Sequence, residues 1–237
     1  MTSSLGKPSR AILTFLAVLM APCILQGQTR QAAYGQMAPL DQYLMSPEAE
    51  IQLARSAAPE SISRDAEILV LARQGYDTAV PGKNGFVCMV QRSWTAGIDD
   101  PDFWNPKLRA PICFNPAGAR SYLPIILKKT TLVLTGRTKT QIFEDIAVAF
   151  EKKQLPTQES GSMGFMMSKD AYLGDRDGHW HPHLMFYVPE TDTTSWAAGL
   201  PGSPVFGARD SQDHLTVFFI PVLSWSDGTN APPMKNE

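Results

Sequence analysis

The middle of the chain carries the clearest alternation of hydrophobic and polar positions, and its period is that of a helix. Thr138 and Gln141 form a capping box at the start of this segment, and Pro156 follows its end. We therefore predict a helix from residue 138 to about Lys153. Its apolar face would carry Ile142, Phe143, Ile146, Ala149 and Phe150.

Two other segments begin with helix-start signals. In each, an N-cap residue, Ser46 or Asn115, stands directly before a proline, which is favoured at the first helical position. These signals predict helices over 46–57 and 115–136. Pro124 would interrupt the second helix, because a proline inside a helix removes a backbone hydrogen bond.

Short apolar or β-branched runs bounded by Gly, Pro and Asp predict strands late in the chain. These runs cover 162–168, 184–188 and 215–222. Earlier in the chain, the runs 66–79 and 85–94 flank an Asn-Gly turn signal, so they predict a hairpin. We expect loops over 95–115 and 189–213.

Helices in the middle of the chain, with strands on both sides of them, indicate an α+β fold. We expect a largely antiparallel sheet with the central helical segment packed on it. Residues 46–237 are enough for a single domain with one substantial core. The polar, irregular residues 28–45 predict a flexible lead-in to that domain.

The first 27 residues have the pattern of an export signal peptide. Lys7 and Arg10 form a basic start, and the apolar stretch 11–25 is short for a membrane span. We expect cleavage after Gly27 and a periplasmic or secreted protein. Lipid attachment at Cys23 and an uncleaved anchor are the less favoured alternatives.

Charge excludes some classes of partner. The chain has 21 basic and 23 acidic residues, and loss of Lys7 and Arg10 would change the formal net charge from −2 to −4. A nucleic-acid-binding protein would present a basic face, so we expect no nucleic-acid partner. After cleavage, no apolar run reaches the length of a transmembrane span.

Two cysteines, Cys88 and Cys113, follow the predicted signal peptide. In an oxidising compartment, a lone pair is most simply a disulfide. Closing a loop of about 25 residues would stabilise the fold by roughly 3 kcal/mol on the chain-entropy model. Two buried thiols are the alternative interpretation.

Candidate chemistry concentrates in a histidine cluster. His179, His181 and His183 stand at alternate positions, and on an extended strand they would share one face. Neutral imidazole is the commonest protein ligand for transition metals. A pair of these histidines with His214, which opens the next predicted strand, would suit zinc or another divalent transition metal. Nearby methionines also permit copper.

A metal held there would activate water for hydrolysis. Asp175, Asp177 or Glu190 could add a carboxylate ligand, and Asp177 or Glu190 is the candidate catalytic base. The cluster could instead bind a small polar ligand without a metal. The histidines could also be structural, bonding backbone groups and packing on aromatic rings.

A different class of function is a non-catalytic periplasmic or secreted binding or structural module. The predicted loops and strand ends carry several tryptophans, whose rings could hold a glycan, another small molecule or an envelope component. These tryptophans are Trp94, Trp104, Trp180 and Trp196.

Four segments resemble a family of uncharacterised exported bacterial proteins. They are 45–51, 84–88, 103–106 and the GHWHPH motif at 178–183. The resemblance covers most of the chain after the predicted signal peptide. It implies export but brings no activity, cofactor or site residue.

Overall fold

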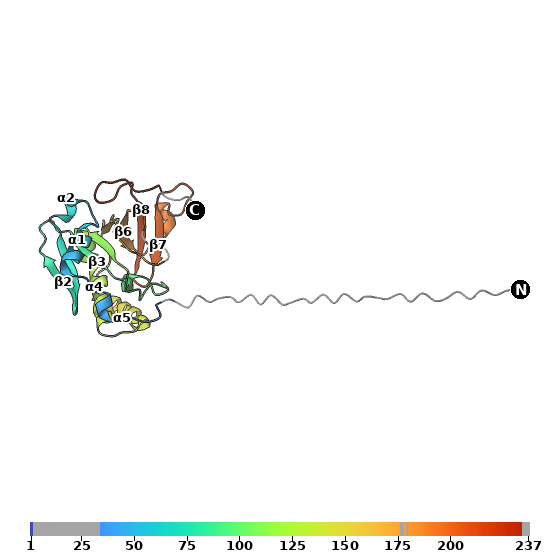
Figure 1. The fold of residues 1–237 in the computed structure, drawn as a ribbon, viewed down its shortest axis with the longest axis horizontal. Coiled ribbons are helices and arrows are strands. Elements are labelled where there is room, and N and C mark those ends of the chain that lie inside the picture. The colour runs from blue at the N-terminus through green and yellow to red at the C-terminus, as the bar shows by residue number, and fades with distance from the viewer. Residues whose placement is uncertain (2–33, 176–177, 179, 234–237) are drawn as a thin grey trace. The chain divides into compact units, whose positions relative to one another are not determined.

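An eight-stranded sheet forms the centre of the structure, in the order β2-β1-β3-β4-β5-β6-β8-β7 (Figure 1). The computed structural model describes Met1, residues 34–175, Gly178 and residues 180–233. Contacts divide the chain into Met1–Arg30 and Gln31–Glu237, and the described helices and strands belong to the second unit. The predicted signal peptide, 1–27, lies outside the described residues except for Met1.

The sheet is largely antiparallel, as predicted, because only β1 and β3 run parallel. Its strands are β1 (Glu67–Ala72), β2 (Gly75–Val80), β3 (Val87–Gln91), β4 (Ala110–Phe114), β5 (Met163–Met166), β6 (His183–Pro189), β7 (Phe206–Asp210) and β8 (Leu215–Pro221). The three strands predicted late in the chain correspond to β5, β6 and β8.

The helices begin where the capping signals predicted. Side-chain oxygens of Ser46, Asn115 and Thr138 accept backbone N–H groups at the starts of α1, α3 and α5. Both hydrogen bonds of the predicted capping box are present at α5. The helices are α1 (Pro47–Arg55), α2 (Glu60–Ser63), α3 (Pro116–Ser121), α4 (Leu123–Leu134) and α5 (Lys139–Glu151), with 3-10 turns η1 (Leu40–Gln42), η2 (Ser93–Thr95) and η3 (Thr193–Trp196).

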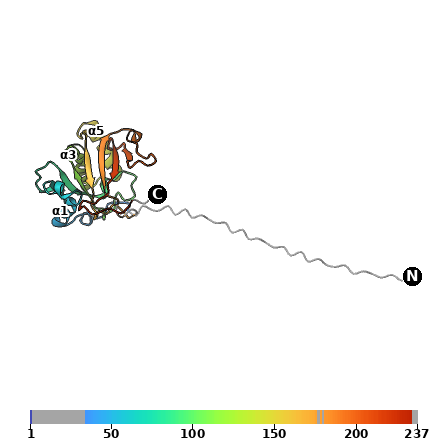
Figure 2. The same cartoon turned by 90° about the horizontal axis from the view of Figure 1, so that it is seen from above.

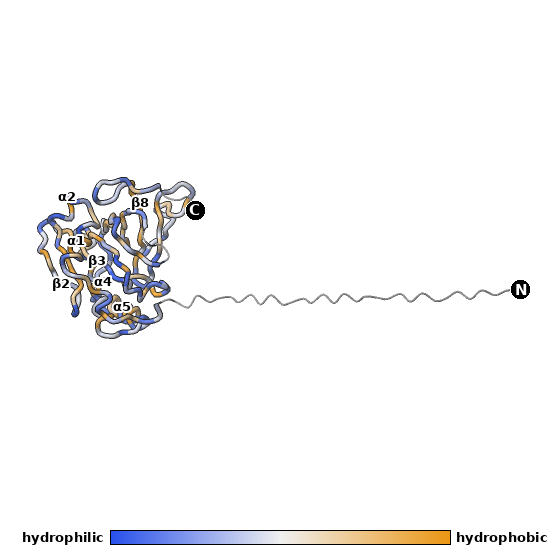
Figure 3. The backbone as a smooth tube through the Cα atoms, in the orientation of Figure 1, coloured by the Kyte–Doolittle hydropathy of each residue, from blue (hydrophilic) through white to orange (hydrophobic). Residues whose placement is uncertain are grey.

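Helices cover both faces of the sheet, and Figure 2 shows α1 and α5 on opposite sides. The face that carries Phe114, Tyr187 and Val217 packs into the larger core with α4 and α5, so we call it the α4–α5 face. The opposite face, which carries Cys88 and Cys113, packs against Ala54 of α1 and against Ala57 and Ala58, which follow that helix, so we call it the α1 face. Hydrophobic residues recur along the strands and along α4 and α5 (Figure 3).

The predicted hairpin between 66–79 and 85–94 is wrong in its pairing. The hairpin lies inside the first segment, where β1 and β2 pair through a turn at Arg73 and Gln74. Because β2 occupies one edge of β1, β3 pairs with the other edge and runs parallel to β1. Asn84 and Gly85 lie in the connection between β2 and β3.

Two strands lie in segments that we expected to be loops. β4 falls within 95–115, and β7 falls within 189–213. Proline is rare in central strands because it cannot donate to a ladder. Pro111 is tolerated in β4 because it pairs only with Val90 of β3, whereas the β4–β5 pairing is confined to Cys113 and Phe114.

The packed structure also extends into the segment expected to be a flexible lead-in. Tyr43 is fully buried, and its hydroxyl donates a hydrogen bond to the backbone oxygen of Trp104 at 2.8 Å. Its ring contacts that of Trp94, with centroids 5.0 Å apart. Residues 34–45 therefore pack against the core, chiefly through Tyr43, in contrast to that expectation.

The structure joins Cys88 and Cys113 in a disulfide. The two residues stand directly opposite each other in β3 and β4, and both are fully buried. The predicted pairing is thus confirmed. Within the described part of the chain, no helix is long and apolar enough to cross a membrane.

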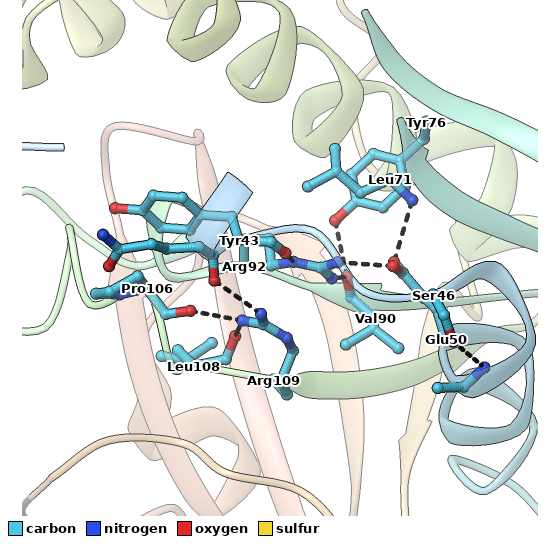
Figure 4. Close-up of polar contacts among 12 residues, drawn as sticks. Tyr43, Ser46, Glu50, Leu71, Tyr76, Val90, Arg92, Pro106, Leu108 and Arg109 are labelled. Carbon is cyan, nitrogen blue, oxygen red and sulfur yellow. Dashed lines mark hydrogen bonds and ion pairs between the residues drawn. The ribbon is translucent and has the colours of Figure 1, made fainter. Parts of the chain in front are cut away.

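A buried ion pair joins α1 to the residue after β3 (Figure 4). Arg92 Nη2 donates to Glu50 Oε2 at 2.8 Å, and Arg92 Nε donates to the backbone oxygen of Tyr43 at 2.8 Å. The other carboxylate oxygen, Glu50 Oε1, accepts the Leu71 N–H at 3.1 Å. Each atom of this carboxylate therefore has a partner in the core.

A second buried ion pair joins α4 to the turn between β7 and β8. Lys129 Nζ lies 2.7 Å from Asp213 Oδ2, and both side chains are 1% exposed. Burial raises the pKa of Asp213, and the nearby charge of Lys129 partly opposes that effect. This pair connects the larger core to the edge of the sheet.

Candidate ligand-binding site

The structure places His183 inside an aromatic cluster. His183 is the first residue of β6 and is only 3% exposed. Its Nδ1 lies 2.7 Å from the backbone oxygen of His181, and the ring of Trp180 is 4.5 Å away between centroids. Burial lowers the pKa of His183 to about 4, so the ring is neutral at physiological pH.

Of the other two members of the predicted cluster, His181 is described, and it lies before the strand rather than in it. Because β6 begins at His183, the expected alternation over 179–187 holds only from that residue onward. His181 is partly exposed, and its ring lies 6.4 Å from that of Trp225. The candidate ligand His179 and the candidate base Asp177 lie outside the described residues.

His214 and Glu190 lie at the other end of the same strand pair. His183 pairs with Pro221, whereas the residue next to His214, Leu215, pairs with Pro189. Six residues of strand separate the two ends, which corresponds to roughly 20 Å. His214 packs on Phe150 instead, with centroids 4.6 Å apart. The structure therefore does not bring His214 or Glu190 to His183.

The carboxylate of Asp175 is occupied by other partners. It accepts hydrogen bonds from the hydroxyls of Tyr34 and Tyr172, and Lys107 Nζ lies 3.4 Å away. These hydrogen bonds, with that from Tyr172 the stronger, hold the pKa of Asp175 below its usual value. Among the residues with a described position, no group of three His, Cys, Asp or Glu side chains could hold a metal ion.

Three partly exposed aromatic residues lie together on the α4–α5 face, where the sheet reaches its edge. Trp180 is 40% exposed and meets Phe219 of β8 edge-on, with centroids 5.5 Å apart. Phe206 of β7 is 42% exposed and pairs directly with Phe219, so both side chains stand on the same face. We call Trp180, Phe219 and Phe206 the aromatic strip.

A hollow of about 580 Å³ adjoins this strip, and we call it the sheet hollow. The loop 97–100 lies on one side of it, and β7, β8 and the turn between them lie on the other. Its lining combines apolar and polar side chains, including Ile98, Asp99, Asp100, Asp210, Gln212 and Phe219. An apolar surface with a few polar groups is the usual composition of a small-ligand site.

The same loop borders a second hollow of about 760 Å³, which we call the helix-turn hollow. Ile98, Asp99 and Asp100 line both hollows. The helix-turn hollow is also lined by Tyr34 and Met37 before η1, by Trp104, and by the segment from the end of α4 to the start of α5. That segment contributes Arg137, Thr138 and Lys139.

Two interactions of Lys139 hold the shared loop against α5. Its Nζ donates to the backbone oxygen of Asp100 at 3.3 Å and lies 4.9 Å from the centre of the Phe103 ring. Asp100 Oδ1 in turn accepts the N–H of Asp102 at 2.7 Å. The loop between the hollows is therefore fixed by specific contacts.

Trp180 is a candidate contact residue predicted from the sequence, whereas the rest of this surface was not predicted. Phe206 fell in a predicted loop, and Phe219 was one apolar residue in a predicted strand. They become neighbours only through the pairing of β7 with β8. The segment 206–210 carries no clear strand signal of its own, because Phe-Gly-Ala-Arg-Asp does not alternate apolar and polar residues.

Comparison of the chain with models of protein families, with curated proteins and with solved structures found no match.

Proposed function

We propose that this protein is an exported binding module that holds a carbohydrate chain on the aromatic strip and in the sheet hollow. The observation that carries this proposal is the strip itself. Trp180, Phe219 and Phe206 present aromatic surface at the edge of a sheet whose other aromatic residues are mostly covered. The buried disulfide supports folding in an oxidising compartment.

The chemistry beside the strip suits a sugar. A sugar ring has an apolar C–H face, which packs on an aromatic ring, and a rim of hydroxyl groups, which need hydrogen-bond partners. Asp99, Asp210 and Gln212 line the adjoining hollow and supply carboxylate and amide groups of that kind. This combination favours a neutral polyhydroxylated ligand over a purely apolar one.

The two hollows favour a chain over a single sugar. They lie on opposite sides of one loop and share Ile98, Asp99 and Asp100. An oligosaccharide that crosses the loop would contact both hollows, whereas a monosaccharide would fill part of one. Affinity should therefore rise with the number of sugar units.

Metal-assisted hydrolysis at the histidine cluster stays a prediction, because it depends on His179. The described histidines give it no support, since His183 is buried against Trp180 and His214 lies at the far end of β6 and β8. The same residues have a direct role in the binding proposal. His183 packs beneath Trp180 and so fixes the orientation of its ring.

The chain provides a matched pair of tryptophans for the test. Trp196 is 37% exposed, close to the 40% of Trp180, but it stacks on Phe218 and so lies on the α1 face. Binding of soluble cello-oligosaccharides, chito-oligosaccharides and peptidoglycan fragments should be measured by calorimetry for wild type, Trp180→Ala and Trp196→Ala. We expect Trp180→Ala to weaken binding about tenfold, which corresponds to roughly 1.4 kcal/mol of lost stacking.

Trp196→Ala should bind as wild type does. Failure of every probe to bind would overturn the carbohydrate assignment. Equal losses of affinity in the two variants would contradict a site on the aromatic strip, because Trp196 lies on the opposite face of the sheet.

A further inference from the structure

The Lys129–Asp213 pair brings a nucleophile and an acyl group together in a buried part of the core. The Nζ and Oδ2 atoms are 2.7 Å apart, and both side chains are 1% exposed. The Phe143 ring lies 5.0 Å from Nζ and adds to the apolar surroundings. An amine this close to one carboxyl oxygen is also within contact distance of the carboxyl carbon, one bond away.

The carboxyl group of Asp213 is only half satisfied. Its Oδ1 is buried and has no hydrogen-bond partner among the residues that the structure describes. Both oxygens of Glu50, in the other buried pair, have partners. A buried, unpartnered carboxylate oxygen is costly, and the cost falls when the group becomes neutral.

We propose that Lys129 and Asp213 form a covalent amide cross-link within the folded chain. A proton first passes from the ammonium to the carboxylate along their hydrogen bond, which leaves a neutral amine and a carboxylic acid. The amine nitrogen then attacks Cγ, a C–N bond forms, and one C–O bond breaks. The hydroxyl oxygen leaves as water with the acid proton and a proton from nitrogen, so no oxidant or cofactor is required.

The surroundings favour both the neutral pair and the product. Burial raises the pKa of Asp213, which favours the protonated acid. The folded chain also holds the two reacting groups in contact, which replaces a bimolecular encounter by an intramolecular one. Asp210 Oδ1 accepts the N–H groups of Gln212 and Asp213 at 3.1 Å, and this fixes the turn that carries the acid.

The cross-link would tie α4 to the turn between β7 and β8, across 84 residues of sequence. That turn borders the sheet hollow through Ser211 and Gln212. The bond would therefore hold one wall of the hollow in place without entering it. This inference is independent of what the hollow binds.

The test is the mass of the full purified chain, measured after reduction and denaturation. We expect the measured mass of the wild-type chain to be lower, by the mass of one water, than the mass calculated for the same chain without the cross-link. Protease digestion should then release a branched peptide that joins α4 to the β7–β8 turn. A wild-type chain at full sequence mass, with native circular dichroism before denaturation, would overturn the proposal.

Two variants make the chemistry specific. Lys129→Arg keeps the charge but cannot form this amide, so it should show its full sequence mass. Asp213→Asn would react with loss of ammonia in place of water and should give the same cross-linked mass as the wild type. A branched peptide at other residues, or a mass deficit that survives Lys129→Arg, would contradict the assignment.

Discussion

The two buried ion pairs differ in how the oxygen atoms of the buried carboxylate are supplied with hydrogen-bond partners. At Glu50 and Arg92, a planar guanidinium and a carboxylate share their remaining hydrogen bonds with backbone groups of Tyr43, Val90 and Leu71 (Figure 4). At Lys129 and Asp213, an ammonium meets one oxygen, and the other oxygen has no partner in the described chain. A buried charge pair is stabilised by its complete set of partners, and the first site has that set.

The difference follows from the side chains. Arginine offers five donors in a fixed fork, so one residue can bind a carboxylate and several carbonyl groups at once. Lysine offers a compact charge that is also a nucleophile when neutral. The first pair therefore suits a permanent non-covalent junction between α1 and β3, whereas the second is suited to becoming a bond.

The largest expected effect is at the first pair. Arg92→Met would leave Glu50 as an uncompensated buried charge, and we expect a loss of about 3–5 kcal/mol in the free energy of unfolding. The control is Arg64→Met, whose partner Glu60 is exposed, and this variant should lose much less stability because solvent screens the pair. Urea unfolding of both variants measures the difference. Equal losses would mean that burial of the Arg92 pair is not what makes it important.

The next effect in size is expected when both Lys129 and Asp213 are replaced. For a simple buried ion pair, Lys129→Met/Asp213→Leu should be neutral or stabilising, because apolar side chains of similar size avoid the desolvation cost. For a covalent cross-link that closes 84 residues, the same double variant should lose about 4 kcal/mol. We expect the loss, again measured by urea unfolding. Unchanged or raised stability would show that Lys129 and Asp213 form a simple ion pair without a cross-link.

The smallest expected effect is a pH dependence of stability that arises from burial of His183 and not from a charged partner. His183 is buried without an acidic partner in the described residues, and its pKa is lowered from 6.5 to about 4. The folded state therefore favours the neutral ring. This contribution, about 3 kcal/mol, is fully present above pH 6.5 and is lost as the pH falls through 4. Unfolding free energies of wild type and His183→Gln at pH 7 and pH 4 should converge at the lower pH.

A pH dependence that is the same for His183→Gln and wild type would contradict the assignment of the effect to the buried ring.

The fold could be predicted from the sequence where structure is determined locally. The caps at Ser46, Asn115 and Thr138 are contacts within one turn of helix, so the printed sequence contains both partners. The apolar face of α5 is buried as predicted, because a helical period is visible over its whole length.

The fold could not be predicted where a segment depends on a partner that is distant in the sequence. β4 contains a proline and is held by β3, while β7 is mostly exposed and, among the described strands, pairs with β8 alone. Neither has enough local signal to be distinguished from a loop. The histidine site was predicted from an assumed strand, and the chain instead turns at Gly174 and Gly178 before β6 begins. The aromatic strip could not be predicted for the same reason, since Phe206 and Phe219 become neighbours only when β7 pairs with β8.

The position of the disulfide has a consequence for how the protein is made. Cys88 and Cys113 face each other across β3 and β4 and are fully buried under α1. An oxidant can reach their thiolates only while these strands are still open, because exchange needs access to the sulfur atoms. A chain that closed its sheet before meeting an oxidant would shut both thiols away. The disulfide therefore forms before the sheet closes, so the cysteines are oxidised first and the strands pack under α1 afterwards.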